Sequence, residues 1–337
     1  MSRIACFSCF TFAELPAAQV MARSLKRVHP DWELWAIIPD LPPAGLGAAA
    51  LAMFDKAMDG ASMRLAARPA WLFGHTAAQA KAAMQPWMLA ELLAGGTAAV
   101  VHLSPGMAVF ASLQPWLDTA GDAAVILSPH HRAPAASQAV QRERETRAAV
   151  DGLYDPGLLA VRANAEGEAF AAWWQARLEA PEEWAAEGVG KLHDLAPSLF
   201  GARVSRDAGC NVAPWNLAER PISVDAVGDF SVAGVKLRCM QFAAVPPEGK
   251  PGDHPIAEEL VSWHAEAVRR AALHLPAPAA WAWACFEDGT PIPAAARAVY
   301  RQRRDLRLAF PNPFAAGDCS FAAWLRTEMP LIMEPAA

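Results

Sequence analysis

The chain has 337 residues, of which 54% are hydrophobic and 19% charged, so it can bury a sizeable core and is not globally disordered. Its net charge of -6 implies no domain-scale basic surface, which argues against nucleic acid as the main partner. No apolar run reaches the roughly 18 residues that span a bilayer, so no transmembrane segment is expected.

The first apolar run, Ile4 to Phe12, follows Met1-Ser2-Arg3 in the manner of a signal peptide. No small-residue cleavage site follows it and Glu14 comes early, so we expect a first core strand and a cytoplasmic protein with reduced thiols. Cys6 and Cys9 form a C-x-x-C spacing, but no second ligand pair accompanies them. Core cysteines are therefore the simpler interpretation.

Short apolar runs alternate with longer amphipathic ones through the first half of the chain, as in βαβ units. The expected strands are 4–9, 34–38, 98–103, 123–127 and 158–161, and the expected helices are 13–28, 75–93, 138–150 and 166–178. The run 98–103 carries no formal charge, which indicates burial on both faces of a sheet. Pro86 should kink the second helix or mark its start, and Trp173-Trp174 should lie in the core.

The second half has a different pattern. Residues 230–242 predict antiparallel strands around a turn at Ala233-Gly234, which indicates a mixed, mostly parallel α/β sheet. Pro and Gly residues concentrate at 245–255, and helical patterns follow at 257–273 and 294–304. We therefore expect one domain over residues 1–245 and a helical, Pro-rich C-terminal extension over residues 246–337 that packs on the core.

A series of short motifs runs in order through residues 80 to 245. They are Pro86-Trp87, the strand 100–103 with Ser104-Pro105-Gly106, Ser128-Pro129-His130, Gly152-Leu153-Tyr154, Trp173-Trp174 and the stretch Arg206 to Pro221. In this order they resemble bacterial glycosyltransferases related to the glycogenin-like family. The resemblance implies the nucleotide-sugar transferase (GT-A) fold, and transfer of a sugar from a nucleotide-sugar donor to a bacterial glycan or protein acceptor.

The same resemblance implies an Asp-x-Asp motif after the strand 100–103, where two carboxylates hold a divalent cation against the donor diphosphate. Ser104 and Gly106 stand at those positions, and Gln241 stands where the family has a histidine ligand. Serine, glycine and glutamine supply only neutral, weak coordination. We therefore expect a degenerate motif with no Mn²⁺ or Mg²⁺ site, and no cofactor.

Two interpretations follow. In the first, the chain is a metal-independent glycosyltransferase, whose leaving diphosphate is stabilised by side-chain cations, hydroxyls and backbone N–H groups. The candidate donor- or sugar-binding residues are Ser104, Gly106, His130, Lys191, Arg206, Asn211, Trp215, Asn216 and Arg220. Asp155 or Asp194 is the candidate acceptor base in an inverting reaction, and His130 is a weaker one.

In the second interpretation, the chain is a catalytically inactive glycosyltransferase-like domain that acts as a binding or assembly module. Each candidate residue also has a structural alternative. These alternatives are a helix surface for Asp194, a turn for Asp155, loop polarity for His130, and a structural turn for Asn211, Trp215 and Asn216.

Overall fold

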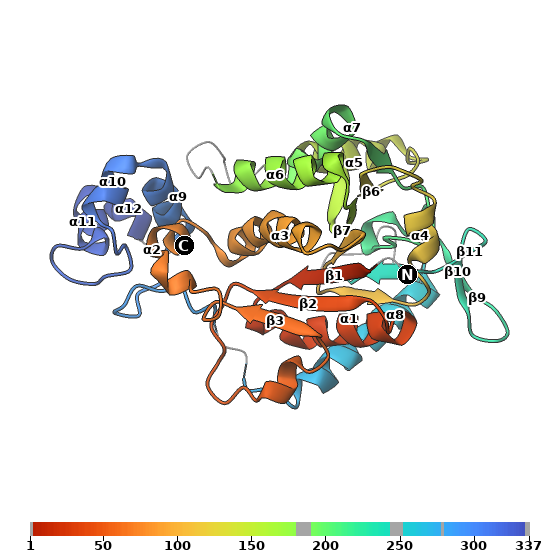
Figure 1. Cartoon of the computed structure of the whole chain (residues 1–337), viewed down its shortest axis with the longest axis horizontal. Helices are drawn as coiled ribbons and strands as arrows, with labels where there is room; N and C mark the ends of the chain where they lie inside the picture. Colours follow the sequence, from red (N-terminus) through yellow and green to blue (C-terminus); the bar gives the residue numbers. More distant parts are fainter. Residues whose placement is uncertain (1–2, 180–189, 243–251, 278–279, 334–337) are drawn as a thin grey trace.

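A seven-stranded sheet forms the centre of the computed structural model, which describes residues 3–179, 190–242, 252–277 and 280–333 (Figure 1). Its order is β3-β2-β1-β4-β7-β6-β8. The strands are β1 (Ile4–Cys9), β2 (Glu33–Ile38), β3 (Lys56–Asp59), β4 (Ala99–Leu103), β6 (Val125–Pro129), β7 (Tyr154–Arg162) and β8 (Ala202–Val204). β7 is antiparallel to β4 and β6, and the other pairs are parallel. The predicted mixed, mostly parallel sheet is confirmed.

Helices cover both faces of this sheet (Figure 1). α1 (Leu15–Val28) lies on one face, while α3 (Ala77–Ala94) and α6 (Ala165–Glu179) lie on the other. Alternate residues of β1 point to opposite faces, so Cys6 is buried on the α1 side and Cys9 on the α3 side. The interpretation of both as core cysteines is confirmed, since their side chains do not form a pair.

The positions of Pro86 in α3 and of Trp173 and Trp174 in α6 agree with the predictions from the sequence. Thr76 caps α3 by accepting a hydrogen bond from Gln79 N, so Pro86 lies inside the helix and does not mark its start. Trp174 is fully buried and Trp173 is half-buried in the α3-side core, as expected. The charged helix α5 (Gln138–Asp151) is also confirmed.

The late strands form two small sheets of their own. β5 (Met107–Val109) pairs with β12 (Cys239–Gln241), while β10 (Phe230–Val232) pairs with both β9 (Ile222–Val224) and β11 (Val235–Lys236). Ala233 and Gly234 both have positive φ, at 48° and 82°, as a tight hairpin turn requires. The antiparallel prediction is confirmed, but the mixed character of the main sheet comes from β7 instead.

The C-terminal part is helical, as expected. α8 (Pro255–Ala272) packs on α1. The other helices are α9 (Ala294–Gln302), α10 (Arg304–Ala309), α11 (Phe321–Glu328) and α12 (Pro330–Met333), which gather around α2 (Pro69–Phe73) (Figure 1). The expected domain boundary at residue 245 lies outside the described residues. Within the described ranges, none of the helices has the length and apolarity that crossing a membrane requires.

Phe73 joins α2 to this C-terminal cluster. Its ring lies 5.0 Å from that of Tyr300 and 5.4 Å from that of Phe321, measured between centroids. Arg297 Nη1 donates to the carbonyl oxygen of Phe73 at 3.0 Å, and Arg301 Nη1 donates to that of Gly74 at 2.9 Å. The cluster therefore shares one hydrophobic core with a helix from the first quarter of the chain.

Candidate functional site

Several candidate residues lie at one edge of the main sheet. β4, β6 and β8 run in the same direction, so Ser104, His130 and Arg206 follow their carboxyl ends at this edge. β7 runs the opposite way and begins there, which brings Asp155 to the same place. Open α/β sheets bind their ligands outside the carboxyl ends of the strands, so this edge is the first place to examine.

Ser104 and Gln241 contact each other directly. Gln241 Nε2 donates to Ser104 Oγ at 3.1 Å. Phe242 N donates to the carbonyl oxygen of Gly106 at 2.8 Å, and Gln241 pairs with Met107 across β12 and β5. The residues at which the resemblance implies metal ligands therefore meet in space. Gln241 Oε1 is buried and has no hydrogen-bond partner among the described residues.

Asp155 lies next to this pair. Its Oδ1 accepts a hydrogen bond from Gly157 N at 2.8 Å, and Ser104 N donates to the carbonyl oxygen of Gly157 at 2.8 Å. A methyl group on Gly157 would lie 2.9 Å from Asp155 Oδ1 and 3.2 Å from Ser104 Cβ, so both residues flank this glycine. Asp155 is only 8% exposed, and no described residue bonds to its Oδ2. One oxygen holds the turn, and the other is buried without a partner among the described residues.

His130 is half-buried beside Asp155. Burial lowers the pKa of His130 below its ordinary value, and the negative charge of Asp155 opposes this shift, so the imidazole is neutral at pH 7. Its Nε2 atom is enclosed and bonds to none of the described residues. The ring lies edge-on to Trp215, with 5.6 Å between centroids. A neutral imidazole nitrogen and a carboxylate oxygen are thus available at one place.

The stretch 206–221 contains residues with two different roles. Asn216 Nδ2 donates to the carbonyl oxygens of His130 and Asn211, both at 3.1 Å, and its Oδ1 accepts from Ala213 N at 2.9 Å. Arg220 is fully buried and donates to the carbonyl oxygens of Cys210 and Asn211. Asn216 and Arg220 therefore fold the loop, as the structural alternative for this stretch supposed.

Asn211 and Trp215 differ from these two residues. Asn211 is 1% exposed with a left-handed φ of 55°, and both polar atoms of its side chain have no partner in the described parts of the chain. The same holds for Trp215 Nε1. Buried polar groups in proteins are normally hydrogen-bonded, so such atoms indicate a ligand or water site.

Six of these residues lie in one region, and Gln241 N donates to the carbonyl oxygen of Val212, the residue after Asn211, at 2.7 Å. We call them the polar ring. Its members are Ser104, Asp155, His130, Asn211, Trp215 and Gln241. Five of them carry the unpartnered polar atoms named above, and Ser104 bonds to Gln241.

The remaining candidates lie outside the ring. Asp194 Oδ1 accepts from Leu153 N at 2.8 Å, and burial raises the pKa of Asp194 although this hydrogen bond lowers it. Lys191 and Arg206 are exposed. Lys191 shares the short helix Gly190–Leu195 with Asp194, and the two charges are close enough to interact.

The polar ring is a poor fit to a divalent cation. It offers one carboxylate, from Asp155, together with the neutral oxygens of Ser104, Asn211 and Gln241 and the imidazole nitrogen of His130. Mg²⁺, Ca²⁺ and similar hard cations are held in proteins chiefly by carboxylate and carbonyl oxygens, usually with more than one acid. In the described ranges, no three His, Cys, Asp or Glu side chains gather as a metal site would require.

Glu219 is a residue of this region that the sequence did not single out. Its carboxylate accepts from His131 Nδ1 at 2.9 Å, from Arg132 N at 2.8 Å and from Ala133 N at 3.1 Å. Burial would raise the pKa of Glu219, but the bonds from His131 and Arg132 lower it overall. Glu219 therefore fixes the segment that follows His130. The only sequence signal was an acid inside the stretch 206–221.

No family model matches the chain, and no curated protein sequence does. Solved structures with a related arrangement include glycosyltransferases. The galactosyltransferase LgtC, in complex with donor and acceptor sugar analogues, is 14% identical over 81% of this chain and 96% of that chain, with a TM-score of 0.42. GlyE of Streptococcus pneumoniae TIGR4 is 10% identical over 85% of this chain and 67% of that chain, with a TM-score of 0.44. Likenesses of this degree carry no argument about activity.

Proposed function

We propose that the chain transfers a sugar from a nucleotide-sugar donor to a bacterial glycan or protein acceptor without a bound metal ion. The observation that carries this proposal is the polar ring at the carboxyl edge of the sheet. Its unpartnered amide, imidazole and indole groups are suited to sugar hydroxyls, and Asp155 supplies one free carboxylate oxygen. The neutral contact between Gln241 and Ser104 supports the metal-free part.

Charge on the leaving diphosphate needs another source of stabilisation in the absence of a metal. The Ser104 hydroxyl, the backbone N–H of Gly106 and the exposed cations Lys191 and Arg206 are the candidates. Among the described residues, a methyl group on Gly106 would meet only the carbonyl oxygen of Phe242, at an ordinary 3.5 Å. The packing therefore does not require a glycine at position 106. This supports the proposal that Gly106 lets a phosphate of the donor approach the backbone closely.

The reaction itself is a single substitution. An acceptor hydroxyl oxygen forms a bond to the anomeric carbon of the donor sugar, and the bond from that carbon to the diphosphate oxygen breaks. The diphosphate leaves with the electron pair. In the inverting course the hydroxyl proton passes to Asp155, whose Oδ2 is unpartnered, whereas Asp194 lies beyond the ring.

A catalytically inactive binding module is the second candidate. It is favoured by the deep burial of Asp155 and by the use of its other oxygen in the turn to Gly157. The two candidates share donor binding and differ only in turnover.

The test is a thermal-shift panel of UDP-, GDP- and dTDP-sugars, each with manganese and with EDTA, followed by assay of donor turnover. The proposal expects stabilisation by one donor class that EDTA leaves unchanged, together with release of the nucleotide diphosphate. Stabilisation without turnover would favour the binding module. Stabilisation only with manganese would refute the metal-free proposal, and no response to any donor would refute donor binding.

A further inference from the structure

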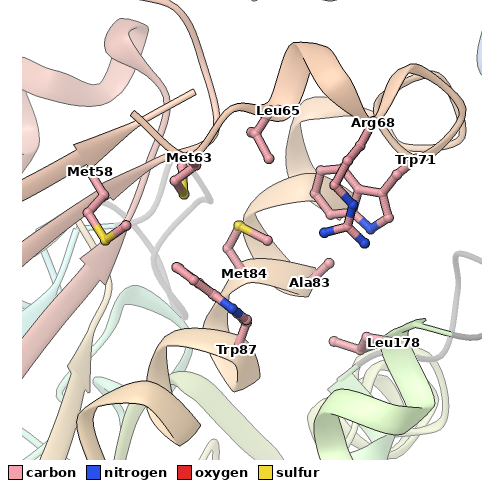
Figure 2. Close-up of a pocket in the computed structure, with 9 residues that line it drawn as sticks. All are labelled: Met58, Met63, Leu65, Arg68, Trp71, Ala83, Met84, Trp87 and Leu178. Carbon is pink, nitrogen blue, oxygen red and sulfur yellow. The ribbon is translucent and has the colours of Figure 1, made fainter. Parts of the chain in front are cut away.

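A cavity of about 360 Å³ opens on the α3 side of the main sheet (Figure 2). Small-molecule sites typically have volumes of roughly 300 to 1,000 Å³. The lining side chains come from β3, the segment 63–71, α3 and the end of α6. They are Met58, Met63, Leu65, Arg68, Trp71, Ala83, Met84, Trp87 and Leu178. The cavity is thus large enough for a compact ligand.

The walls of the cavity consist of only a few kinds of side chain. Three methionines and two tryptophans provide most of the lining, and Arg68 is the one charged residue among the nine. Figure 2 shows the Arg68 guanidinium beside the Trp71 indole, and its central carbon lies 5.6 Å from the centre of that ring. Methionine and tryptophan side chains favour aromatic partners, because sulfur and indole both contact ring faces and edges well.

Arg68 has no acidic partner in the described parts of the chain. It is exposed, and none of the carboxylates in the described ranges forms an ion pair with it. The rim of the cavity is therefore suited to an anion.

The position of the cavity separates it from the polar ring. Met58 belongs to β3, which lies three strands from β4 in the order of the sheet. At a spacing of about 4.8 Å per strand, this places the cavity roughly 14 Å along the carboxyl edge from the strand that precedes Ser104. A compact ligand in the cavity would therefore not reach the polar ring.

We propose that this cavity binds a small ligand that combines an aromatic ring with one anionic group, with the ring among the methionine and tryptophan side chains and the anion on Arg68. Two sources share this chemistry, namely the base and phosphate of a nucleotide and a simple aromatic acid. The proposal does not depend on glycosyl transfer, and binding alone tests it.

The experiment is isothermal titration calorimetry of the full chain with 2-naphthoate, its neutral counterpart 2-naphthalenemethanol, and UMP. We expect one 2-naphthoate per chain, with the alcohol binding about five- to tenfold more weakly because it lacks the charge-assisted contact. Displacement of 2-naphthoate by UMP assigns the site to a nucleotide, and failure of UMP to compete assigns it to an aromatic acid. The proposal is overturned if neither anion binds or if the alcohol binds equally well.

Two pairs of variants locate the ligand. Arg68→Gln should weaken 2-naphthoate about five- to tenfold, whereas Arg64→Gln removes the same charge from an exposed residue outside the cavity and should not. Ala83→Phe should fill the cavity and weaken binding by more than about tenfold, while Ala78→Phe makes the same change on the exposed side of α3. Equal binding by Ala83→Phe and Ala78→Phe would overturn the proposal. If Ala83→Phe does not fold, the arginine pair decides alone.

Discussion

The polar ring and the apolar cavity lie along one side of the same protein but are built in opposite ways. The ring is held by hydrogen bonds from buried side chains to backbone carbonyls, chiefly those of Asn216 and Arg220. Among the described residues, the cavity is lined mainly by methionine and tryptophan side chains, and Arg68 is the one charged lining residue. A hydrogen-bonded framework fixes where polar atoms point, whereas methionine side chains adapt their shape to a ligand. The ring is therefore the better place for chemistry, and the cavity for binding.

The largest expected effect is a loss of catalytic activity in a variant of the polar ring that still binds the donor. Asp155→Asn should lower kcat/KM for transfer by about 10² to 10⁴-fold, because the amide cannot accept the acceptor proton. The variant should keep its thermal stabilisation by the donor. Asp194→Asn is the matched control and should change kcat/KM by less than about fivefold. Equal losses in both variants would remove Asp155 from the role of base.

Loss of the hydrogen bonds that hold the loop around the polar ring should lower the stability of the protein. Arg220→Met leaves the buried carbonyl oxygen of Cys210 without this donor and that of Asn211 with only Asn216, and should lower the free energy of unfolding by about 2 to 4 kcal/mol in urea titrations. Arg206→Met alters an exposed arginine of the same stretch and should stay within about 0.5 kcal/mol of the parent. A small effect of Arg220→Met would show that the loop is held by other contacts.

The turn that carries Asp155 should respond to pH. Burial lowers the pKa of His102 to about 4, and its Nδ1 contacts the carbonyl oxygen of Pro156 at 2.8 Å. The unfolded chain then binds a proton that the folded chain does not, so stability is present above pH 6.5 and is lost as the pH falls toward 4. His29, His75, His193 and His264 have pKa values lowered in the same direction, also to about 4.

This dependence is measured as the change in free energy of unfolding between pH 7 and pH 5. A loss of at least about 1 kcal/mol per pH unit is expected. His102→Gln should reduce the slope by about 1 kcal/mol per pH unit. An unchanged slope in this variant would mean that His102 is not the titrating group.

A smaller effect tests the contact between the uncharged side chains of Ser104 and Gln241 in the polar ring. Ser104→Asp combined with Gly106→Asp restores two acids beside Asp155, and manganese should then raise the melting temperature by about 2 to 6 °C in a manner reversed by EDTA. Ser104→Asn with Gly106→Asn has the same size without the charge and should not respond. A response of the parent chain to manganese would contradict the metal-free proposal.

Strands buried on both faces were predictable from sequence, and edge strands were not. The expected strands at 4–9, 34–38 and 98–103 are β1, β2 and β4, because uninterrupted apolar runs mark a strand buried on both faces. β3, by contrast, is a short edge strand of exposed and half-buried residues with no apolar run. β7 begins at Tyr154 and not at Leu158, because Asp155, Pro156 and Gly157 have the composition of a turn.

The candidate site could be predicted only in part. The resemblance pointed to Ser104, Gln241 and the stretch 206–221, and these do come together. The division of that stretch into residues that fold the loop and residues with unpartnered atoms depends on contacts far apart in sequence, such as Asn216 with His130. Glu219 was missed for the same reason, since its partner segment lies more than eighty residues earlier.

The placement of Phe73 also affects the order in which the protein is completed during synthesis. Its ring packs against Phe286, Tyr300, Phe314 and Phe321, all of which leave the ribosome more than two hundred residues later. Until then α2 exposes a large aromatic surface, and the nascent chain has a region that its own sheet does not cover. The last helices thus complete a hydrophobic core that the first quarter of the chain begins.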